Sequence, residues 1–586
     1  TYYFILNKFK ITFALPLKGL IMQRLFEDFT PVSREEWEAK ALKDLRGKTL
    51  QDLTSTTRDG IEIKPFYTEA NVKPQPQKPK TGWDVIQEIL VMNEAEANAQ
   101  ALDALNRGAN GLLFYMNPEV DFNVLLAEIS LPHIAMHFVS EENGREVLLR
   151  LLAYAEKSGS DINTWNFTIN KDCFENALRT GNYFETLEED LADLQEMVDA
   201  DIDGFKSVCI NANIYHNSGS TVAEELAIAL AQGHEYLTKL EIKDASKFWF
   251  NFAIGPNYFE QIAKFRAFRR VWNNVLTQYG IETTPTSLYA ETGSRNKTIF
   301  DSHVNLLRTT TETMSAVLGG ADQVCIKPFD TTYNPTSFGE RIARNQQLLL
   351  EYESYFSKIN DPAAGAYFIE NLTEEIAQKA WSIFQDIEAH GGFLKGIEDG
   401  SIQERILTSA HSEQKAFDNN NISLLGTNLY PNKEEKMADK LVYPQFYKET
   451  TGTVEIEPLQ TKRLAEKLEQ ARLETEKGDD LYGIFHCFTG TEAQAHKAIS
   501  FNMKLGIGGV VTFKNGKIDT FLNKFDLKYI VLETDSPYLS PVPYRGKRNE
   551  SSYITYVVDK LVDIYGVSFE EIAKITTQNS KEVFGI

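Results

Sequence analysis

The chain has 586 residues, 42% of them hydrophobic, and this length exceeds what one ordinary hydrophobic core organises, so two or more domains are expected. Its 60 basic and 83 acidic residues give a formal net charge of -23, which argues against broad electrostatic binding to nucleic acid or to anionic membranes. The four cysteines are far apart in the sequence, so we expect a reducing, cytoplasmic environment rather than a disulfide framework.

Residues 1–21 form an apolar leader that we expect to lie outside the fold. Lys8, Lys10 and Lys18 divide its apolar residues into runs of about seven, too short to cross a bilayer, so no membrane association is expected. An organellar transit peptide is the weaker interpretation, because Arg and Ser are scarce in this stretch.

Residues 22–80 form an expected N-terminal arm and linker. Ser33 is followed three positions later by Glu36, which is the pattern of a helix capping box. The predicted helix carries an apolar stripe made of Trp37, Leu42 and Leu45. The prolines within residues 71–80 favour an extended, weakly packed linker. We expect the arm to pack on another domain or another chain, the alternative being a mobile tail.

Residues 81–425 alternate short β-rich runs with helical stretches. Eight such runs occur, at 111–115, 134–139, 164–168, 207–210, 248–252, 288–291, 323–327 and 366–369. Eight α/β units in about 290 residues predict a (β/α)8 TIM barrel, in which functional residues lie in the loops after the strands. A doubly wound open sheet is the alternative fold.

The most regular of these units spans residues 297–330. Its apolar residues recur at intervals of three, four and seven and predict the buried face of a helix; they are Phe300, Val304, Leu307, Met314 and Leu318. The opposite face would carry Asn305, Arg308 and Glu312. Two glycines at 319 and 320 end the helix before the next strand. On this interpretation, Leu307→Asp is expected to prevent soluble folding.

Residues 426–477 form a charged connector with a predicted helix at 459–476. A second α/β segment follows at residues 478–586, where three strand-like runs alternate with helices, at 481–488, 504–511 and 528–535. Three strands do not close a barrel, so we expect an incomplete TIM-barrel piece with open sheet edges.

The barrel region resembles the methylmalonyl-CoA mutase family over roughly residues 22–477. The resemblance is carried by LYAETGSRNKTIFDSHVNLLRTTTETMSAVLGGADQVCIKPFD from Leu288, NPTSFGERIARNQQLLLEYESYF from Asn334 and DPAAGAYFIENLTEEIA from Asp361. It implies a TIM barrel whose core admits coenzyme A, and an adenosylcobalamin-dependent radical interconversion of methylmalonyl-CoA and succinyl-CoA.

Several groups that the family's catalytic subunits carry are absent from this chain. The family's catalytic loop matches residues 215–219, YHNSG, so Tyr215 and His216 are the candidate catalytic residues. His216 could hydrogen-bond a thioester carbonyl, but its neighbours differ from the family's, and we favour a structural or vestigial role.

The chain also lacks the cobalt-ligating Asp-x-His-x-x-Gly motif, to which Asp301-Ser302-His303 comes closest without the glycine. The resemblance is therefore to the small, non-catalytic subunit without its last domain. It implies a heterodimer with the catalytic large subunit, which alone would hold adenosylcobalamin, and it leaves acyl-CoA binding by this barrel open.

Residues 479–586 resemble the TatD-type metal-dependent hydrolases, many of which are deoxyribonucleases. The matching stretches are GIFHCFTG from Gly483, IGGVVTFKN from Ile507, LETDSPYLSPVPYRGKRNE from Leu532 and NSKEVFGI from Asn579. The resemblance implies that His486 and Asp535 are metal-site residues at strand ends and that Arg545 contacts phosphate or substrate. The family's other metal ligands have no counterpart here, so we expect a remnant site, weak binding of a divalent metal and no hydrolysis by this piece alone.

Three hypotheses follow for the whole chain. In the first, it is a structural subunit of a mutase complex; in the second, it is a metal-dependent nuclease or phosphoesterase. In the third, it joins two truncated genes through a deletion, a frameshift or an assembly error. We favour the third for the origin of the chain and the first for its function.

Overall fold

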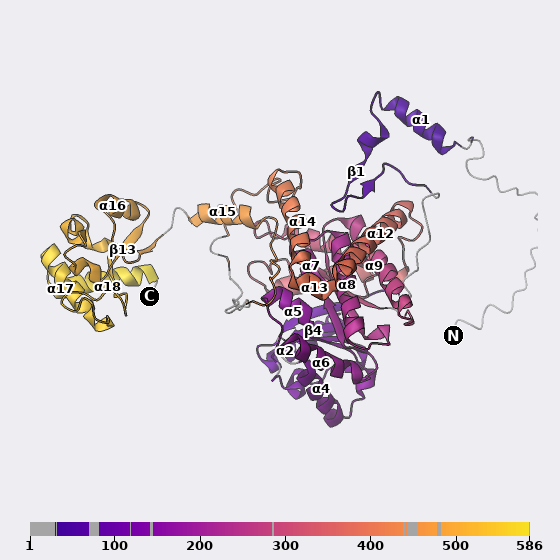
Figure 1. Cartoon of the computed structure of the whole chain (residues 1–586), viewed down its shortest axis with the longest axis horizontal. Helices are drawn as coiled ribbons and strands as arrows, with labels where there is room; N and C mark the ends of the chain where they lie inside the picture. The colour runs from indigo at the N-terminus through magenta and orange to yellow at the C-terminus, as the bar shows by residue number, and fades with distance from the viewer. Residues whose placement is uncertain are drawn as a thin grey trace, which may run out of the picture. The chain divides into compact units, whose positions relative to one another are not determined.

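The computed structural model describes residue 30 and residues 32–68, 81–117, 119–140, 144–283, 286–437, 440–441, 454–477 and 482–584 (Figure 1). The expected leader at 1–21 and the proline-rich linker at 71–80 lie outside the described residues. The chain divides into two compact units, Thr1–Asn71 and Val72–Ile586. Among the described helices, none combines the length and the apolar character needed to span a bilayer.

The N-terminal unit contains the predicted capped helix. Helix α1 (Arg34–Asp44) begins with a capping box, in which the Glu36 amide donates to Ser33 Oγ at 3.2 Å and the Ser33 amide donates to Glu36 Oε2 at 2.9 Å. The short strands β1 (Ser55–Thr56) and β2 (Glu62–Ile63) pair antiparallel after it. Within the described arm no residue of α1 is buried, and Trp37 contacts Phe66 with ring centroids 4.1 Å apart. The apolar stripe of α1 is therefore largely exposed.

The second unit contains a parallel β-barrel. Its strand order is β7-β6-β5-β4-β3-β11-β10-β9-β8, and every neighbouring pair is parallel. Ser207 alone separates β7 (Phe205–Lys206) from β8 (Val208–Asn211), so these two segments form one interrupted strand and the ring of eight strand positions closes. The other strands are β3 (Asp84–Leu90), β4 (Gly111–Tyr115), β5 (Ala135–Val139), β6 (Asn166–Asn170), β9 (Phe248–Ile254), β10 (Ser287–Thr292) and β11 (Gln323–Cys325). The predicted (β/α)8 TIM barrel is confirmed.

Helices surround this barrel, and α12 packs across α8 and α9 on its outside (Figure 1). In chain order the helices are α2 (Glu94–Asn106), α3 (Phe122–Leu125), α4 (Gly144–Ser158), α5 (Cys173–Thr180), α6 (Leu187–Asp199), α7 (Asn213–Asn217), α8 (Val222–Lys239), α9 (Tyr258–Gln278), α10 (Val304–Gly319), α11 (Ser337–Leu348), α12 (Tyr367–His390), α13 (Gly392–Glu398) and α14 (Ser401–Asp418). Phe250, Phe268 and Trp272 meet where β9 packs under α9, with ring centroids 4.6 to 6.4 Å apart.

One predicted strand is wrong and one real strand was not predicted. Residues 366–369 form the start of α12, where Ile369, Leu372, Thr373 and Ile376 are buried at the three- and four-residue spacing of a helix. The missing strand is β3, whose run DVIQEIL contains the polar residues Gln87 and Glu88. These side chains are only half-buried at the carboxyl end of the barrel, which is why the run lacked a continuous apolar signal.

The predicted faces of α10 are also wrong. The helix buries Asn305 and Glu312 and leaves Leu307 65% exposed. Asn305 is satisfied inside the protein, where its Nδ2 donates to the carbonyl oxygens of Thr298 (2.8 Å) and Phe329 (3.1 Å). Glu312 accepts from the buried Lys297 ammonium at 2.8 Å. Because these polar groups are paired, the helix can turn its polar side inward.

The connector helix α15 (Glu466–Lys477) is shorter than predicted. The buried Glu469 Oε1 accepts from the Ile299 amide at 2.7 Å.

The C-terminal piece contains a three-stranded parallel sheet. Its strands, in order, are β12 (Gly483–Phe485), β13 (Met503–Ile507) and β14 (Ile530–Leu532). Helices α16 (Glu492–Ser500), α17 (Ile554–Tyr565) and α18 (Phe569–Phe584) cover it, and apolar residues of the helices and strands share one core (Figure 1). The predicted incomplete barrel piece is confirmed.

Candidate functional site

Three rings meet in the interior of the TIM barrel. His137 on β5, Trp249 on β9 and Tyr289 on β10 are each at most 2% exposed. The His137 ring centroid lies 5.3 Å from that of Trp249 and 5.4 Å from that of Tyr289, and the last two are 4.9 Å apart. Because β5 and β10 stand four positions apart in a ring of eight, the rings meet across the barrel. Leu113 and Cys209 belong to the same buried cluster.

Two hydrogen bonds hold these rings in place. His137 Nδ1 lies 2.9 Å from Thr168 Oγ1, and Trp249 Nε1 donates to Gln323 Oε1 at 3.1 Å. Burial, followed by the nearby Lys206 cation, lowers the pKa of His137 from 6.5 to about 3, so its imidazole is neutral. A neutral, packed imidazole is a filler of the barrel core rather than a proton donor.

Charged residues line the carboxyl end of the barrel above these rings. The Lys327 ammonium pairs with Glu88 and lies 3.4 Å from Glu291 Oε2. Asn213 Nδ2 donates to Glu291 Oε1 at 2.7 Å, and Tyr115 OH donates to Glu88 Oε1 at 3.1 Å. This is the end at which TIM barrels carry their active sites, and here the carboxylates are paired with groups of the same chain.

The two candidate catalytic residues of the barrel, Tyr215 and His216, are buried on α7, directly after β8. Tyr215 is fully buried and donates to Gln232 Oε1 at 2.6 Å. His216 Nδ1 lies 3.8 Å from the fully buried Glu225 carboxylate, which also pairs with Lys264 at 2.9 Å. Both side chains are thus engaged in contacts within the protein.

His216 also occupies a slot made by two glycines. An added Cβ on Gly255 would meet the His216 ring at 2.7 Å, and one on Gly293 would meet it at 3.0 Å. These glycines follow β9 and β10, so the loops close directly over the imidazole.

The closest match to the cobalt-ligating motif, at residues 301–303, ends in a histidine that stacks on Phe329 with ring centroids 5.1 Å apart.

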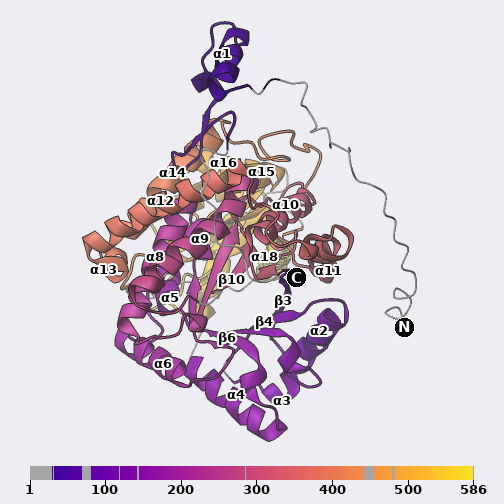
Figure 2. The same cartoon turned by 90° about the vertical axis from the view of Figure 1, so that its right-hand side faces the viewer.

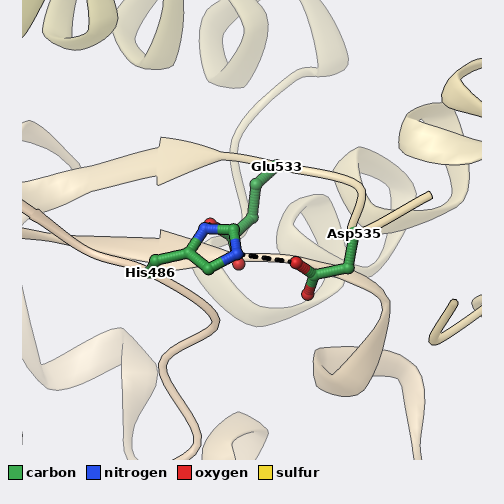
Figure 3. A group of neighbouring side chains, drawn as sticks. All are labelled: His486, Glu533 and Asp535. Carbon is green, nitrogen blue, oxygen red and sulfur yellow. Dashed lines mark ion pairs between the residues drawn. The ribbon is translucent and has the colours of Figure 1, made fainter. Parts of the chain in front are cut away.

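In the C-terminal piece, His486, Glu533 and Asp535 lie together at the carboxyl ends of β12 and β14 (Figure 3). One ligand atom of each lies within 4.8 Å of the others. His486 Nδ1 is 2.6 Å from Glu533 Oε2, and His486 Nε2 is 2.8 Å from Asp535 Oδ1. The imidazole therefore bridges the two carboxylates.

The sequence indicated His486 and Asp535, and the structure brings them together, but it adds Glu533, which was missed. A signal was present, because Glu533 and Asp535 are two carboxylates separated by one residue directly after a strand, where a TIM-barrel fold places its functional residues. Asp535 Oδ2 is buried and has no hydrogen-bond partner among the described residues. Burial and then the Asp535 charge raise the pKa of Glu533, against the opposing effect of His486.

The side chains of His486, Glu533 and Asp535 are a suitable set of ligands for a divalent metal ion. One imidazole and two carboxylates are ligands that zinc and manganese accept, and the unpartnered Asp535 oxygen leaves a lone pair free. A single ion can use one nitrogen of His486, so metal binding would replace one of its two carboxylate contacts. A bound divalent ion supplies Lewis acidity toward an ester or phosphoester oxygen.

Arg545, the candidate phosphate contact, is exposed and lies on a loop ten residues after Asp535 in the sequence. Its guanidinium carbon is 3.7 Å from the centroid of the Phe513 ring. The loop is fixed by the buried Asn549, whose Nδ2 donates to the carbonyl oxygens of Thr534 (2.5 Å) and Tyr538 (2.6 Å). Thr534 precedes Asp535, so the basic loop is anchored beside the carboxylates. The stacked guanidinium keeps its N–H donors available to an anion.

Comparison with known families matches the barrel and the C-terminal three-stranded piece to two different families. The family model described as Methylmalonyl-CoA mutase matches residues 115–480. The family model described as TatD related DNase matches residues 461–585.

Three similar proteins each match part of the chain. The chain is 37% identical over 509 residues to the methylmalonyl-CoA mutase small subunit of Porphyromonas gingivalis, covering 80% of this chain and 81% of that protein. It is 28% identical to the small subunit of Streptomyces virginiae, covering 73% and 74% of the two chains. Among solved structures, a TatD homolog of Escherichia coli shares 24% identity over 21% of this chain and 46% of its own, with a TM-score of 0.18.

Proposed function

Because this chain belongs to the methylmalonyl-CoA mutase family, we propose that it is a small, non-catalytic subunit that pairs with a catalytic, cobalamin-binding large subunit. The reaction of that complex would interconvert methylmalonyl-CoA and succinyl-CoA. Two relatives that cover most of this chain are themselves described as small subunits, which supports this assignment.

The observation that carries the proposal is the closed barrel axis. Family resemblance implies a barrel core that admits coenzyme A, and a pantetheine chain passing along the axis would need the volume held by His137, Trp249 and Tyr289. Displacing rings of this size from a packed core costs several kcal/mol. For scale, replacing one buried Trp or Phe by Ala costs about 3 to 5 kcal/mol. The barrel of this chain thus supports a structural role.

The second support is the state of His216. A histidine that hydrogen-bonds a substrate carbonyl needs an open side toward the substrate. His216 is 8% exposed, and Gly255 and Gly293 lie against its ring. We assign it to the packing of the barrel's carboxyl end, and we assign adenosylcobalamin to the partner.

Two measurements test this function. Titration of the chain with methylmalonyl-CoA in a calorimeter should give no heat of binding, and co-expression with the catalytic subunit should give a stable complex. Binding of the coenzyme A ester at micromolar concentration would contradict the proposed role of the filled axis.

We infer a second function for residues 482–584, the binding of a divalent metal by His486, Glu533 and Asp535. The carrying observation is the cluster itself, in which a buried carboxylate oxygen has no partner among the described residues. His486, at the exposed end of the cluster, would orient the ion, and Arg545 would attract an anionic ester. Metal-dependent hydrolysis of a phosphodiester is the reaction class that this donor set fits, and bis-p-nitrophenyl phosphate with manganese is the probe for it.

A further inference from the structure

The outer side of α11 carries a row of exposed apolar and arginine side chains. Along α11 and the π-helical turn that extends it, Leu349–Glu353, its members form two pairs with a spacing of three residues, 338 with 341 and 349 with 352. They are Phe338, Arg341, Leu349 and Tyr352. Phe338, Leu349 and Tyr352 are 50%, 45% and 64% exposed, whereas the other side of α11 buries Ala343 and Gln347.

Helix α10 continues this surface. The two helices lie side by side (Figure 2), and Gln346 Nε2 of α11 donates to the Leu306 carbonyl oxygen of α10 at 2.7 Å and to Thr310 Oγ1 at 2.6 Å. Leu307, next to Leu306, points outward and is 65% exposed. Leu307 is exposed because α10 buries Asn305 and Glu312 on its other side.

The segment after the π-helical turn adds two more apolar side chains. Tyr355 and Ile359 are 62% and 63% exposed. Tyr355 adopts a left-handed backbone conformation with φ of 58°, which costs an L residue roughly 1 to 2 kcal/mol. Non-glycine residues with strained backbone cluster at catalytic and binding sites, and π-helical turns are also frequent at functional sites.

We propose that this surface, made by Leu307, Phe338, Arg341, Leu349, Tyr352, Tyr355 and Ile359, is where the catalytic large subunit docks. The inference rests on the proposed heterodimer and adds the place of its interface. The surface contains the Tyr, Phe and Arg side chains that are enriched at interface centres, and the exposed Glu353 and Lys358 of the same segment fit a polar rim.

The size of the surface fits such a contact. An aromatic side chain offers about 150–250 Å² to a partner, so three aromatic rings that are half exposed or more provide roughly 300 Å². Leu307, Leu349 and Ile359 enlarge this to the several hundred Å² that mark an interaction site on a soluble protein. A stable heterodimer buries about 800 Å² on each partner, of which this surface would be the apolar centre.

The guanidinium of Arg341 completes the argument from chemistry. It lies over the Phe338 ring, 5.6 Å from the centroid, and is exposed. An arginine stacked on an aromatic ring is already ordered. A partner carboxylate can therefore bind it with little further loss of side-chain conformational entropy. The partner face should therefore be apolar with at least one acidic group.

The test is co-purification of the full chain with the catalytic subunit of a methylmalonyl-CoA mutase complex, followed by measurement of the dissociation constant. The variants Leu349→Arg and Tyr352→Arg place a charge at the centre of the surface, and Leu349→Ala removes contacts without adding one. Leu149→Arg on α4 is the matched control, since Leu149 is 53% exposed and lies elsewhere on the barrel.

We expect Leu349→Arg and Tyr352→Arg to weaken the complex by about tenfold or more, as for residues at an interface centre, and Leu149→Arg to leave it within about twofold. Wild-type binding that Leu349→Arg, Leu349→Ala and Tyr352→Arg all leave unchanged overturns the docking surface and leaves the heterodimer standing. Failure of the wild-type chain to bind overturns the proposed function as well. A wild-type homodimer that Leu349→Arg dissociates would assign the surface to a second copy and overturn the inference.

Discussion

His137 and Tyr289 touch across the barrel, with ring centroids 5.4 Å apart, although they come from strands on opposite sides of the ring. A contact across the axis means that no channel runs between these two strands. A packed axis leaves no room for the coenzyme A passage that the family resemblance implies, and this supports the structural role proposed above.

This contact predicts a particular loss of stability in acid. The pKa of His137 is about 3 in the folded protein and near 6.5 when unfolded. Its contribution is complete above pH 6.5 and is lost as the pH falls toward the folded pKa, because the unfolded chain takes up a proton that the folded protein does not. Between pH 6 and pH 4 the free energy of unfolding should fall by about 1.4 kcal/mol per pH unit from this group.

Urea unfolding of the wild type and of His137→Gln at several pH values measures this contribution. The variant should show a smaller dependence on pH, by the amount just given, whatever its stability at neutral pH. The exposed His496 provides the control, and His496→Gln should keep the wild-type dependence. Parallel pH profiles for wild type and His137→Gln would show that His137 is not buried as a neutral group.

The faces of α10 predict opposite outcomes for two neighbouring substitutions. Leu307→Asp should fold with a change in stability within about 0.5 kcal/mol, because the side chain is 65% exposed. Asn305→Ala should cost about 1 to 3 kcal/mol, because it removes the amide that donates to the carbonyl oxygens of Thr298 and Phe329 inside the protein. Thermal unfolding followed by circular dichroism separates the two. If the Leu307→Asp protein were insoluble, Leu307 would lie on the buried face of α10, as the sequence predicted.

The buried ion pair of Lys264 and Glu225 predicts a large effect. Both side chains are fully buried, and Glu225→Gln would leave the Lys264 ammonium without its counter-charge, at a cost of about 3 to 5 kcal/mol. The exposed pair of Lys40 and Asp44 is the control, where Asp44→Asn should change stability by less than about 1 kcal/mol. Denaturant midpoints report both. A small effect of Glu225→Gln would mean that the ammonium finds another partner or is neutral.

Metal binding can be tested without any activity. Manganese or zinc added to the full chain should bind with a dissociation constant that rises at least about tenfold in Glu533→Gln and in His486→Ala. His496→Ala, a histidine outside the cluster, should bind as the wild type does. Isothermal titration calorimetry with each metal provides the measurement. Equal affinity in all four proteins would place any bound metal elsewhere.

The sequence predicted most of the barrel because its buried strands are short apolar runs between helices, but three features escaped it for physical reasons. The apolar run at 366–369 begins α12, and a short apolar run does not distinguish a strand from a buried helix. Strand β3 carries Gln87 and Glu88 at the polar end of the barrel, so its pattern was broken. Helix α10 pairs Asn305 and Glu312 with distant groups, and tertiary pairing of this kind has no local signal.

The candidate sites show the same division. His486 and Asp535 could be named from motifs, since each follows a strand-like run. Glu533 needed the structure, because its role depends on the His486 ring lying between two carboxylates. The cross-barrel contact of His137 and Tyr289 was also inaccessible, since 152 positions separate the two residues and only strand order brings them together (289 minus 137).

The measurement that tests the central claim most directly is an isomerase assay of the isolated full chain with methylmalonyl-CoA and adenosylcobalamin. The filled barrel axis and the enclosed His216 predict no formation of succinyl-CoA by this chain alone, and turnover only when the catalytic large subunit is added. Succinyl-CoA produced by the isolated chain would contradict the account, because it would require a substrate path through a core that His137, Trp249 and Tyr289 close.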